Sequence, residues 1–235
     1  MHPEAEVILR EKRSDMDIDG LLRAAADKDD HVFVVLDDDP TGVQCVHDVR
    51  VLMEVDEAAL NRVLNQEKLF FLLTNSRALR ADASASLHRR ITSMVHRTAE
   101  KTGRKYLYIS RSDSTLRGHY PLETDILQED LIRCYGKVDG EILCPFFPEA
   151  GRYTLNDIHY VRYGNELIPC AETEFARDRT FGYQSSDLKE YIEEKTEGRV
   201  CRTEVMSFSV DELREKSLRI TKFLAALPDC IPERF

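Results

Sequence analysis

The sequence has no apolar stretch that approaches the roughly 20 residues needed to cross a bilayer. Its opening segment, MHPEAEVILREKRSD, carries too many charges for a secretory signal peptide. Basic residues are not clustered, and 33 of them stand against 43 acidic residues, for a net charge of −10. Because nucleic-acid binding depends on clustered Lys and Arg, we expect neither a membrane nor a nucleic acid as a partner.

The cysteines are also sparse, and they stand singly, with no C-x-x-C pair and no histidine at metal-ligand spacing. This pattern predicts no metal site. It also predicts reduced thiols, and therefore a cytoplasmic protein. The six are Cys45, Cys134, Cys144, Cys170, Cys201 and Cys230.

Short apolar runs alternate with helical periods over the first 150 residues. Strands are predicted over 31–37, 48–53, 68–74, 105–110 and 139–144, and several of these are apolar throughout, as strands covered on both faces are. Helices are predicted over 57–65, 82–102 and 121–134; the second places Leu87, Ile91 and Val95 on one face. The pattern predicts an α/β fold with a mainly parallel sheet flanked by helices in Rossmann-like layers.

The C-terminal portion has a different character. Two half-alternating runs around Gly164-Asn165 predict a β-hairpin. A helix over 186–195, a strand over 200–207 and a last helix over 210–227, capped by Ser209, are predicted to follow. We expect a helical extension over 1–30, one α/β domain over 31–227 and a tail over 228–235.

Four predicted strands are followed by unusually polar loops: DDDPTG at 37–42, TNSR at 74–77, SRSDSTLRG at 110–118 and PFFPEAGR at 145–152. In an open parallel sheet, ligands bind where such loops meet at the carboxyl ends of the strands. Any single loop could instead consist of helix caps and surface ion pairs. Because a buried carboxylate must be paired, protonated or bound to a cation, three successive aspartates after an apolar strand favour a site.

One interpretation of DDDPTG is a phosphatase. Asp37, Asp39 and Thr41 fit the D-x-D-x-T pattern of the haloacid dehalogenase-like phosphatases, and FFLLTN resembles their second motif. Asp37 would then be a nucleophile and Asp39 a general acid and base. That superfamily also needs a lysine beside the phosphate and a later acidic pair, whereas Lys105 precedes its strand and SRSDSTLRG holds a single aspartate.

A second interpretation covers more of the sequence, from about residue 31 to about 208. The segments LDDDPTGVQCVHDV, LLTNSRAL, ISRSDSTLRGHYPLETD, PFFPEAGRYTLNDIHYVR and AETEFARDRTFGYQSSDL resemble successive motifs of the N-terminal domain of the four-carbon acid sugar kinases. The resemblance implies an ATP-dependent kinase for small sugar acids of the threonate, erythronate and oxo-tetronate type. It also implies that residues 31–227 hold the sugar acid and that a separate C-terminal domain holds ATP.

The same resemblance suggests roles for the loop residues. Asp38 and Asp39 match the family's paired aspartates, and one of them, or Asp113, would accept the proton of the attacking hydroxyl. A sugar acid presents a carboxylate and several hydroxyls, which call for arginines and short polar side chains. The candidate substrate-binding residues are Thr41, Gly42, Asn75, Ser76, Arg77, Arg111, Ser112, Ser114, Thr115, Arg117, Gly118, Glu149 and Arg152.

Phosphoryl transfer in such kinases uses ATP and Mg²⁺. The sequence contains no G-x-x-x-x-G-K phosphate loop, and it stops where the nucleotide domain is expected to begin. We therefore expect the ATP-binding domain to be absent, and this chain to bind the acid without phosphorylating it. The expected partners are the sugar acid, that domain and, as an open alternative, further copies of the chain. A sugar-acid-binding module without chemistry of its own is a third hypothesis.

The segment EFARDRTFGYQSS, 174–186, is charged and aromatic. It is predicted to be a lid, or a surface that meets the nucleotide domain, in which case Phe175, Phe181 and Tyr183 would be partly exposed. Among the histidines near the loops, only His119 is a candidate for a role in the site.

Overall fold

The computed structural model describes residues 17–214, and the chain divides into two compact units. Within the described range, the sheet unit comprises residues 17–113 and 118–138, and the hairpin unit comprises residues 114–117 and 139–214. Whether the two units act as the single domain expected over 31–227 stays a prediction. In residues 17–214, no helix is long and apolar enough to span a membrane.

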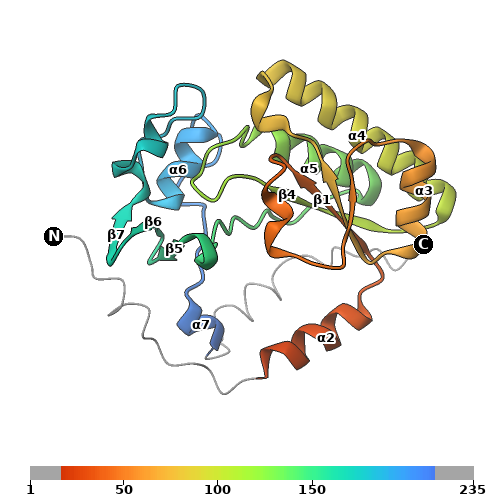
Figure 1. The fold of residues 1–235 in the computed structure, drawn as a ribbon, viewed down its shortest axis with the longest axis horizontal. Helices are drawn as coiled ribbons and strands as arrows, with labels where there is room; N and C mark the ends of the chain where they lie inside the picture. Colours follow the sequence, from red (N-terminus) through yellow and green to blue (C-terminus); the bar gives the residue numbers. More distant parts are fainter. Residues whose placement is uncertain (1–16, 215–235) are drawn as a thin grey trace. The chain divides into compact units, whose positions relative to one another are not determined.

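The sheet unit is built on a four-stranded parallel sheet (Figure 1). Its strands are β1 (Val32–Asp37), β2 (Arg50–Leu52), β3 (Leu69–Leu73) and β4 (Tyr106–Arg111), in the order β2-β3-β1-β4. β1 pairs with both β3 and β4, and Asp37 is in register with Leu73 on one side and Arg111 on the other. The strands predicted over 31–37, 48–53, 68–74 and 105–110 are confirmed, as is the α/β class, although β2 is shorter than expected.

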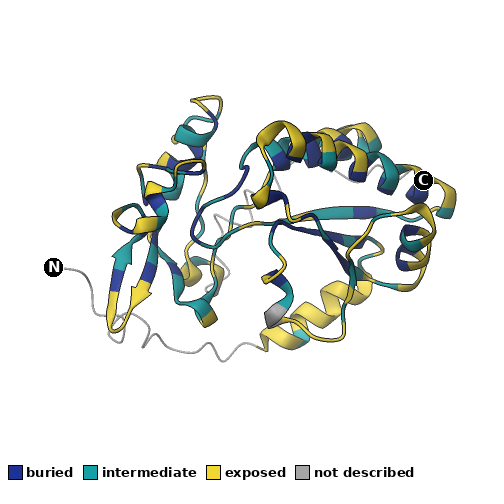
Figure 2. Ribbon diagram, turned by 45° about the horizontal axis from the view of Figure 1, so that its top comes forward, coloured by how far each residue is buried: buried dark blue, intermediate teal, exposed yellow. Residues whose placement is uncertain are grey.

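Three helices follow these strands: α3 (Glu57–Gln66), α4 (Ala81–Thr102) and α5 (Leu122–Tyr135). α4 packs against both α3 and α5. Their apolar faces enclose a core with β1 and β3 that includes Val34, Leu36, Leu60, Phe70, Leu72, Ile91, Val95 and Leu127. Figure 2 shows α4 buried along one side and exposed along the other, as its sequence period predicts.

A further helix, α2 (Ile18–Lys28), lies within the predicted helical extension. The carboxylate of Asp17 caps it by accepting a hydrogen bond from the backbone N–H of Gly20. None of its residues is buried, and Ile18, Leu21 and Leu22 are more than half exposed. Residues 1–16 of the predicted extension lie outside the described residues.

The hairpin unit holds an antiparallel sheet of β5 (Arg152–Leu155), β6 (Ile158–Tyr163) and β7 (Glu166–Pro169), in that order. The predicted turn at Gly164-Asn165 joins β6 to β7 and is confirmed, with a φ of 60° at Gly164. A second turn at Asn156-Asp157, which joins β5 to β6, was not predicted. Both of its residues have positive φ, which Asn and Asp tolerate better than most residues.

Two helices complete the hairpin unit. α6 (Leu188–Lys195) confirms the helix predicted over 186–195, and Asp187 caps it. α7 (Val210–Arg214) begins where the last helix was predicted, and the remainder of that prediction lies outside the described residues. Short 3-10 turns occur at Gly42–Cys45, Ser76–Ala78, Pro148–Ala150, Cys170–Glu172 and Glu174–Arg177.

Two predicted strands are wrong. Residues 139–144 form no strand and belong to the hairpin unit, and Ile142 is 93% exposed. Residues 200–207 also form no strand: a turn interrupts them, in which the Glu204 carboxylate accepts a hydrogen bond from the Cys201 N–H at 2.9 Å. Both segments contain residues that favour strands but have no partner strand in the described structure, and composition alone does not form a strand.

Candidate functional site

In the sheet unit, the first three polar loops meet because β1, β3 and β4 end at the same edge. The backbone N–H of Thr74 donates to the carbonyl of Asp37 at 2.9 Å, and that of Arg77 donates to the carbonyl of Asp38 at 3.3 Å. On the other side, the N–H of Asp38 donates to the carbonyl of Arg111 at 3.2 Å. DDDPTG, TNSR and the start of SRSDSTLRG therefore form one loop cluster, as the sequence predicts. The fourth loop, PFFPEAGR, belongs to the hairpin unit instead.

Asp38 is the most strongly held residue of this cluster. Arg77 grips its carboxylate with a two-pronged ion pair, in which Nε donates to Oδ2 at 2.9 Å and a terminal nitrogen donates to Oδ1 at 2.6 Å. The hydroxyl of Ser112 donates to Oδ2 at 3.1 Å. Burial raises the pKa of the Asp38 carboxyl, although the Arg77 guanidinium acts in the opposite direction.

Asp37 is equally buried but less well paired. A terminal nitrogen of Arg111 lies 3.4 Å from its Oδ1, whereas its Oδ2 is buried and has no hydrogen-bond partner among residues 17–214. Burial raises the pKa of this carboxyl as well. A carboxyl oxygen left in this state is where a proton or a cation would be most stabilising.

Asp39 and Asp113 complete the acidic group. The hydroxyl and N–H of Thr41 donate to the Asp39 carboxylate and hold its pKa below the usual range. A terminal nitrogen of Arg77 lies 3.4 Å from the Asp39 carboxylate and 3.9 Å from the Asp113 carboxylate. The four aspartates outnumber the two guanidiniums that face them, and carboxylate oxygens are ligands of the type that Mg²⁺ prefers.

Two glycines permit this close packing. A Cβ at Gly42 would lie 2.1 Å from Oδ2 of Asp37, and a Cβ at Gly118 would lie 2.2 Å from the hydroxyl of Ser112. Gly118 also has a φ of +141°, which other residues rarely adopt. Gly42 of DDDPTG therefore makes room for the Asp37 carboxylate, and Gly118 of SRSDSTLRG makes room for the Ser112 hydroxyl.

The remaining candidates of the sheet unit differ in accessibility. Thr41, Asn75 and Ser112 are exposed, and Asn75 adopts a left-handed backbone. Ser76 is fully buried, and its hydroxyl accepts a hydrogen bond from Thr74. Ser76 is thus placed to support the loop rather than to contact a ligand. Arg77 and Arg111 are committed to aspartates, which leaves them a positioning role in this structure.

Other buried polar residues lie near these loops, and of these only His119 was a candidate in the sequence. The hydroxyl of Ser84 donates to the Glu123 carboxylate at 2.7 Å, and His88 lies 3.8 Å from the same carboxylate. The charge of Glu123 contributes to the raised pKa of Asp38. His119 is buried, with Nε2 3.1 Å from the Ser76 carbonyl and 3.0 Å from the Leu79 carbonyl, so it ties down the TNSR loop.

In the hairpin unit, Arg117 and Arg152 lie over one aromatic ring. Their guanidinium carbons are 4.9 Å and 5.6 Å from the ring centroid of Phe175. Arg117 also donates from Nε to the Thr115 hydroxyl at 3.1 Å and lies 3.9 Å from the Asp178 carboxylate. Arg152 donates to the Ala150 carbonyl, while its buried Nε has no partner within residues 17–214.

The expected partial exposure of the aromatic residues in the segment 174–186 is wrong for two of the three, whereas Phe175 is partly exposed as expected. Phe181 is 8% exposed and Tyr183 5% exposed, so both belong to the interior of the hairpin unit rather than to an uncovered surface. Phe175 is partly buried beneath the arginines. Its role was missed because the sequence gives no sign that an aromatic ring far along the chain meets SDSTLRG and PFFPEAGR. Glu149 is exposed, and Ser114 is partly buried.

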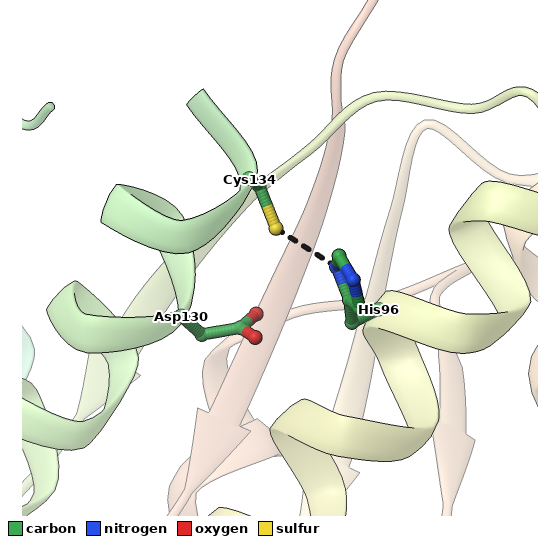
Figure 3. Close-up of side chains that lie close together, drawn as sticks. All are labelled: His96, Asp130 and Cys134. Atoms are coloured by element: carbon green, nitrogen blue, oxygen red, sulfur yellow. Dashed lines mark hydrogen bonds between the residues drawn. The ribbon is translucent and has the colours of Figure 1, made fainter. Parts of the chain in front are cut away.

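A polar cluster between α4 and α5 contains residue types that bind metals (Figure 3). His96 Nδ1 lies 3.0 Å from Cys134 Sγ, and the hydroxyl of Tyr106 lies 2.9 Å from the same sulfur. That hydroxyl also donates to the Asp130 carboxylate at 2.7 Å, and Arg133 forms an ion pair with Asp130. Because a hydroxyl already links the sulfur and the carboxylate, hydrogen bonding accounts for this cluster without a cation.

Comparisons with known proteins give the family. The model of a family described as "Sugar-binding N-terminal domain" matches residues 33–230. Among proteins of curated function, none matches the chain significantly.

Two crystal forms of a Bordetella bronchiseptica protein, described as a domain of unknown function (DUF1537), share 24% identity with this chain. Each aligns with this chain at a TM-score of 0.51. The alignments cover 69% of this chain and 40% or 39% of the Bordetella chain. A Haemophilus influenzae protein of the same family model shares 15% identity at a TM-score of 0.45, covering 70% of this chain and 38% of its own. The chain thus spans about 40% of the length of the solved structures that it matches.

The Bordetella structures support the α/β fold described above, and the family match covers most of the sequence. The chain therefore belongs to the family of sugar-binding N-terminal domains, which confirms the resemblance to the N-terminal domain of the four-carbon acid sugar kinases.

Proposed function

We propose that this chain is the substrate-binding part of a cytoplasmic, ATP-dependent kinase that phosphorylates a four-carbon sugar acid of the threonate, erythronate or oxo-tetronate type. The observation that carries the proposal is the pair of guanidiniums, of Arg117 and Arg152, over the ring of Phe175. The Asp178 carboxylate lies 3.9 Å from Arg117, and the charge of the exposed Glu174 also acts on both guanidiniums. Two planar guanidiniums over one ring nevertheless offer a ligand carboxylate a charge-assisted grip, in competition with these two side chains. The unpartnered Nε of Arg152 offers that ligand a buried donor.

The acidic loop cluster of the sheet unit supports the catalytic half of the proposal. A kinase must remove a proton from the attacking hydroxyl, and Asp38, Asp39 and Asp113 are the candidate bases. Asp38 accepts three hydrogen bonds, two of them from Arg77, whereas Thr41 holds the pKa of Asp39 below the usual range and so makes it a weaker base. The three carboxylates therefore stay alternatives for the base.

ATP and Mg²⁺ are the proposed cofactors. Mg²⁺ would offset the negative charge of the transferring phosphoryl group, and it would be held by aspartates of the loop cluster that do not act as the base. ATP would be supplied by a nucleotide domain beyond this chain.

The Bordetella bronchiseptica structures are described as domain-swapped dimers with bound citrate. Citrate is a small hydroxy acid, which supports a small carboxylic acid as ligand here. The dimers likewise support a second copy of the chain as a partner.

Titration calorimetry with threonate and erythronate tests the proposal. A charge-assisted hydrogen bond contributes on the order of 1.5–3 kcal/mol, so Arg117→Ala or Arg152→Ala should weaken binding by about tenfold or more. The matched control is Arg97→Ala on the outer face of α4, where the side chain bonds to Ser93. Arg117→Lys keeps the charge and loses the planar fork, so it should recover only part of the affinity. Equal affinity of all three alanine variants would contradict the proposal.

The phosphatase alternative makes a different prediction. If Asp37 were a nucleophile, beryllium fluoride with Mg²⁺ would stabilise the protein, and Asp37→Asn would abolish that effect. We expect no stabilisation, because Asp37 is 1% exposed and a terminal nitrogen of Arg111 already lies 3.4 Å from its carboxylate. Phosphatase activity that depends on Asp37 would overturn the kinase proposal in favour of this alternative.

A further inference from the structure

Three consecutive backbone carbonyls of the SDSTLRG loop are held by three side chains of the hairpin unit. Nε2 of His159 lies 2.7 Å from the carbonyl oxygen of Ser114. The hydroxyl of Tyr183 donates to the carbonyl of Thr115 at 2.8 Å, and that of Tyr191 donates to the carbonyl of Leu116 at 3.0 Å. We call His159, Tyr183 and Tyr191 the carbonyl clamp.

The clamp residues come from separate elements and are themselves fixed. His159 lies on β6, Tyr191 on α6 and Tyr183 on the segment between them, and all three are at most 5% exposed. The rings of Tyr183 and Tyr191 meet edge to face, with centroids 5.6 Å apart. Because a carbonyl oxygen can only accept, Nε2 of His159 carries the proton that it donates to Ser114. Nδ1 then accepts from the Thr154 hydroxyl, which lies 2.9 Å away. The clamp therefore presents donors at fixed positions.

The loop that it holds is strained. Leu116 has a φ of 64°, in the left-handed region that a leucine rarely adopts, and its side chain is buried. Such a conformation persists only where the surroundings determine it, and it is found preferentially at functional sites. The next residue is Arg117, whose Nε donates to the hydroxyl of Thr115, a clamped residue.

We propose that the carbonyl clamp sets the affinity for the acid by fixing the position of Arg117, so that His159, Tyr183 and Tyr191 are positioning residues that never touch the ligand. This inference rests on the proposed function, since it assigns Arg117 to the carboxylate. A clamp needed only for folding would change stability without acting through Arg117.

The test removes one clamp hydroxyl at a time. Tyr183→Phe and Tyr191→Phe keep the ring and lose the donor, and each should weaken the binding of threonate or erythronate by about three- to tenfold, the effect of one hydrogen bond. Amide hydrogen exchange of residues 114–117, measured without ligand, should rise in both variants. The control is Tyr135→Phe, whose hydroxyl donates to the carbonyl of Tyr106 at 2.9 Å in the sheet unit. That variant should change neither quantity.

A double-mutant cycle separates positioning from folding. In an Arg117→Ala background, adding Tyr183→Phe should cost no further affinity, because the side chain through which the clamp acts is gone. An undiminished further loss would overturn the inference, and so would unchanged exchange of residues 114–117 in both tyrosine variants. If the wild-type chain binds no four-carbon acid, the proposed function fails, and the exchange data alone then decide whether the clamp holds the loop.

Discussion

At the scale of single residues, Asp38 shows how a buried charge is tolerated. The residue is 2% exposed, and the guanidinium of Arg77 faces its carboxylate with two nitrogens. Removing only the cation would leave a carboxylate without compensation in the protein interior. The stability of the loop cluster should therefore depend on Arg77 more than on other arginines.

Arg77→Ala should lower the free energy of unfolding by about 3 kcal/mol, the usual cost of breaking a buried ion pair from one side. The control is Arg80→Ala, whose ion pair with Asp82 is almost fully exposed, and which should cost less than about 1 kcal/mol. Urea denaturation of both variants at neutral pH measures the difference. Similar losses in the two variants would show that the Asp38 pair contributes no more than a surface pair does.

Asp37 should make the stability of the protein fall as the pH rises. A carboxylate whose pKa is lowered by an ion pair has the opposite effect. The pKa of Asp37 is raised by burial in the folded state, so its contribution to stability is complete below the unfolded pKa of about 3.9 and is lost as pH rises through the folded pKa. Asp37→Asn removes this titration. The variant should therefore gain stability relative to wild type as the pH rises above about 4. A constant or shrinking difference in urea midpoints above that pH would contradict the raised pKa.

The sequence predicts which residue types gather after the strands, because parallel strands end at one edge. It does not predict how they pair. Arg77, Arg111, Arg117 and Arg152 are equivalent candidates in the sequence, whereas in the structure the first two face aspartates and the last two share Phe175. Side-chain pairing of this kind depends on loop geometry, for which local sequence carries no signal.

At the scale of elements, the loop SRSDSTLRG depends on Gly118. Gly118→Ala would place a methyl group 2.2 Å from the Ser112 hydroxyl at a φ of +141°, and it should lower the free energy of unfolding by more than about 1 kcal/mol. Gly140→Ala is the matched control, since nothing lies within 4 Å of its Cβ position. The measurement is thermal and urea unfolding of both variants. A neutral Gly118→Ala would mean that Ser112 moves away at little cost.

Elements with a strong period were predicted well, and those that depend on a partner were not. α4 combines a helical period with Gly103 at its C-terminal end, so local signals agree over its whole length. EILC at 141–144 has equally good strand composition, yet it makes no ladder in the described structure. A strand is stabilised by the strands beside it, and the sequence of a segment does not show whether a sheet edge is available to pair with it.

At the scale of the whole molecule, an acidic chain with a net charge of −10 must concentrate positive potential to bind an acid. The sheet unit uses two of the four candidate arginines to stabilise its own aspartates. The hairpin unit holds the other two over an aromatic ring. The aspartates and their arginines therefore lie in one unit, and the cationic pair lies in the other.

That division leads to a prediction for the chain as a catalyst. The sequence has no G-x-x-x-x-G-K phosphate loop, and it spans about 40% of the Bordetella chain that it matches. With ATP, Mg²⁺ and threonate or erythronate, the chain should therefore bind the acid and release no ADP above background in a coupled assay, in which a hexokinase reaction serves as the positive control. ADP release that requires the sugar acid and is lost in Asp39→Asn or Asp113→Asn would show that this chain alone binds ATP productively, and the separate nucleotide domain would then be unnecessary.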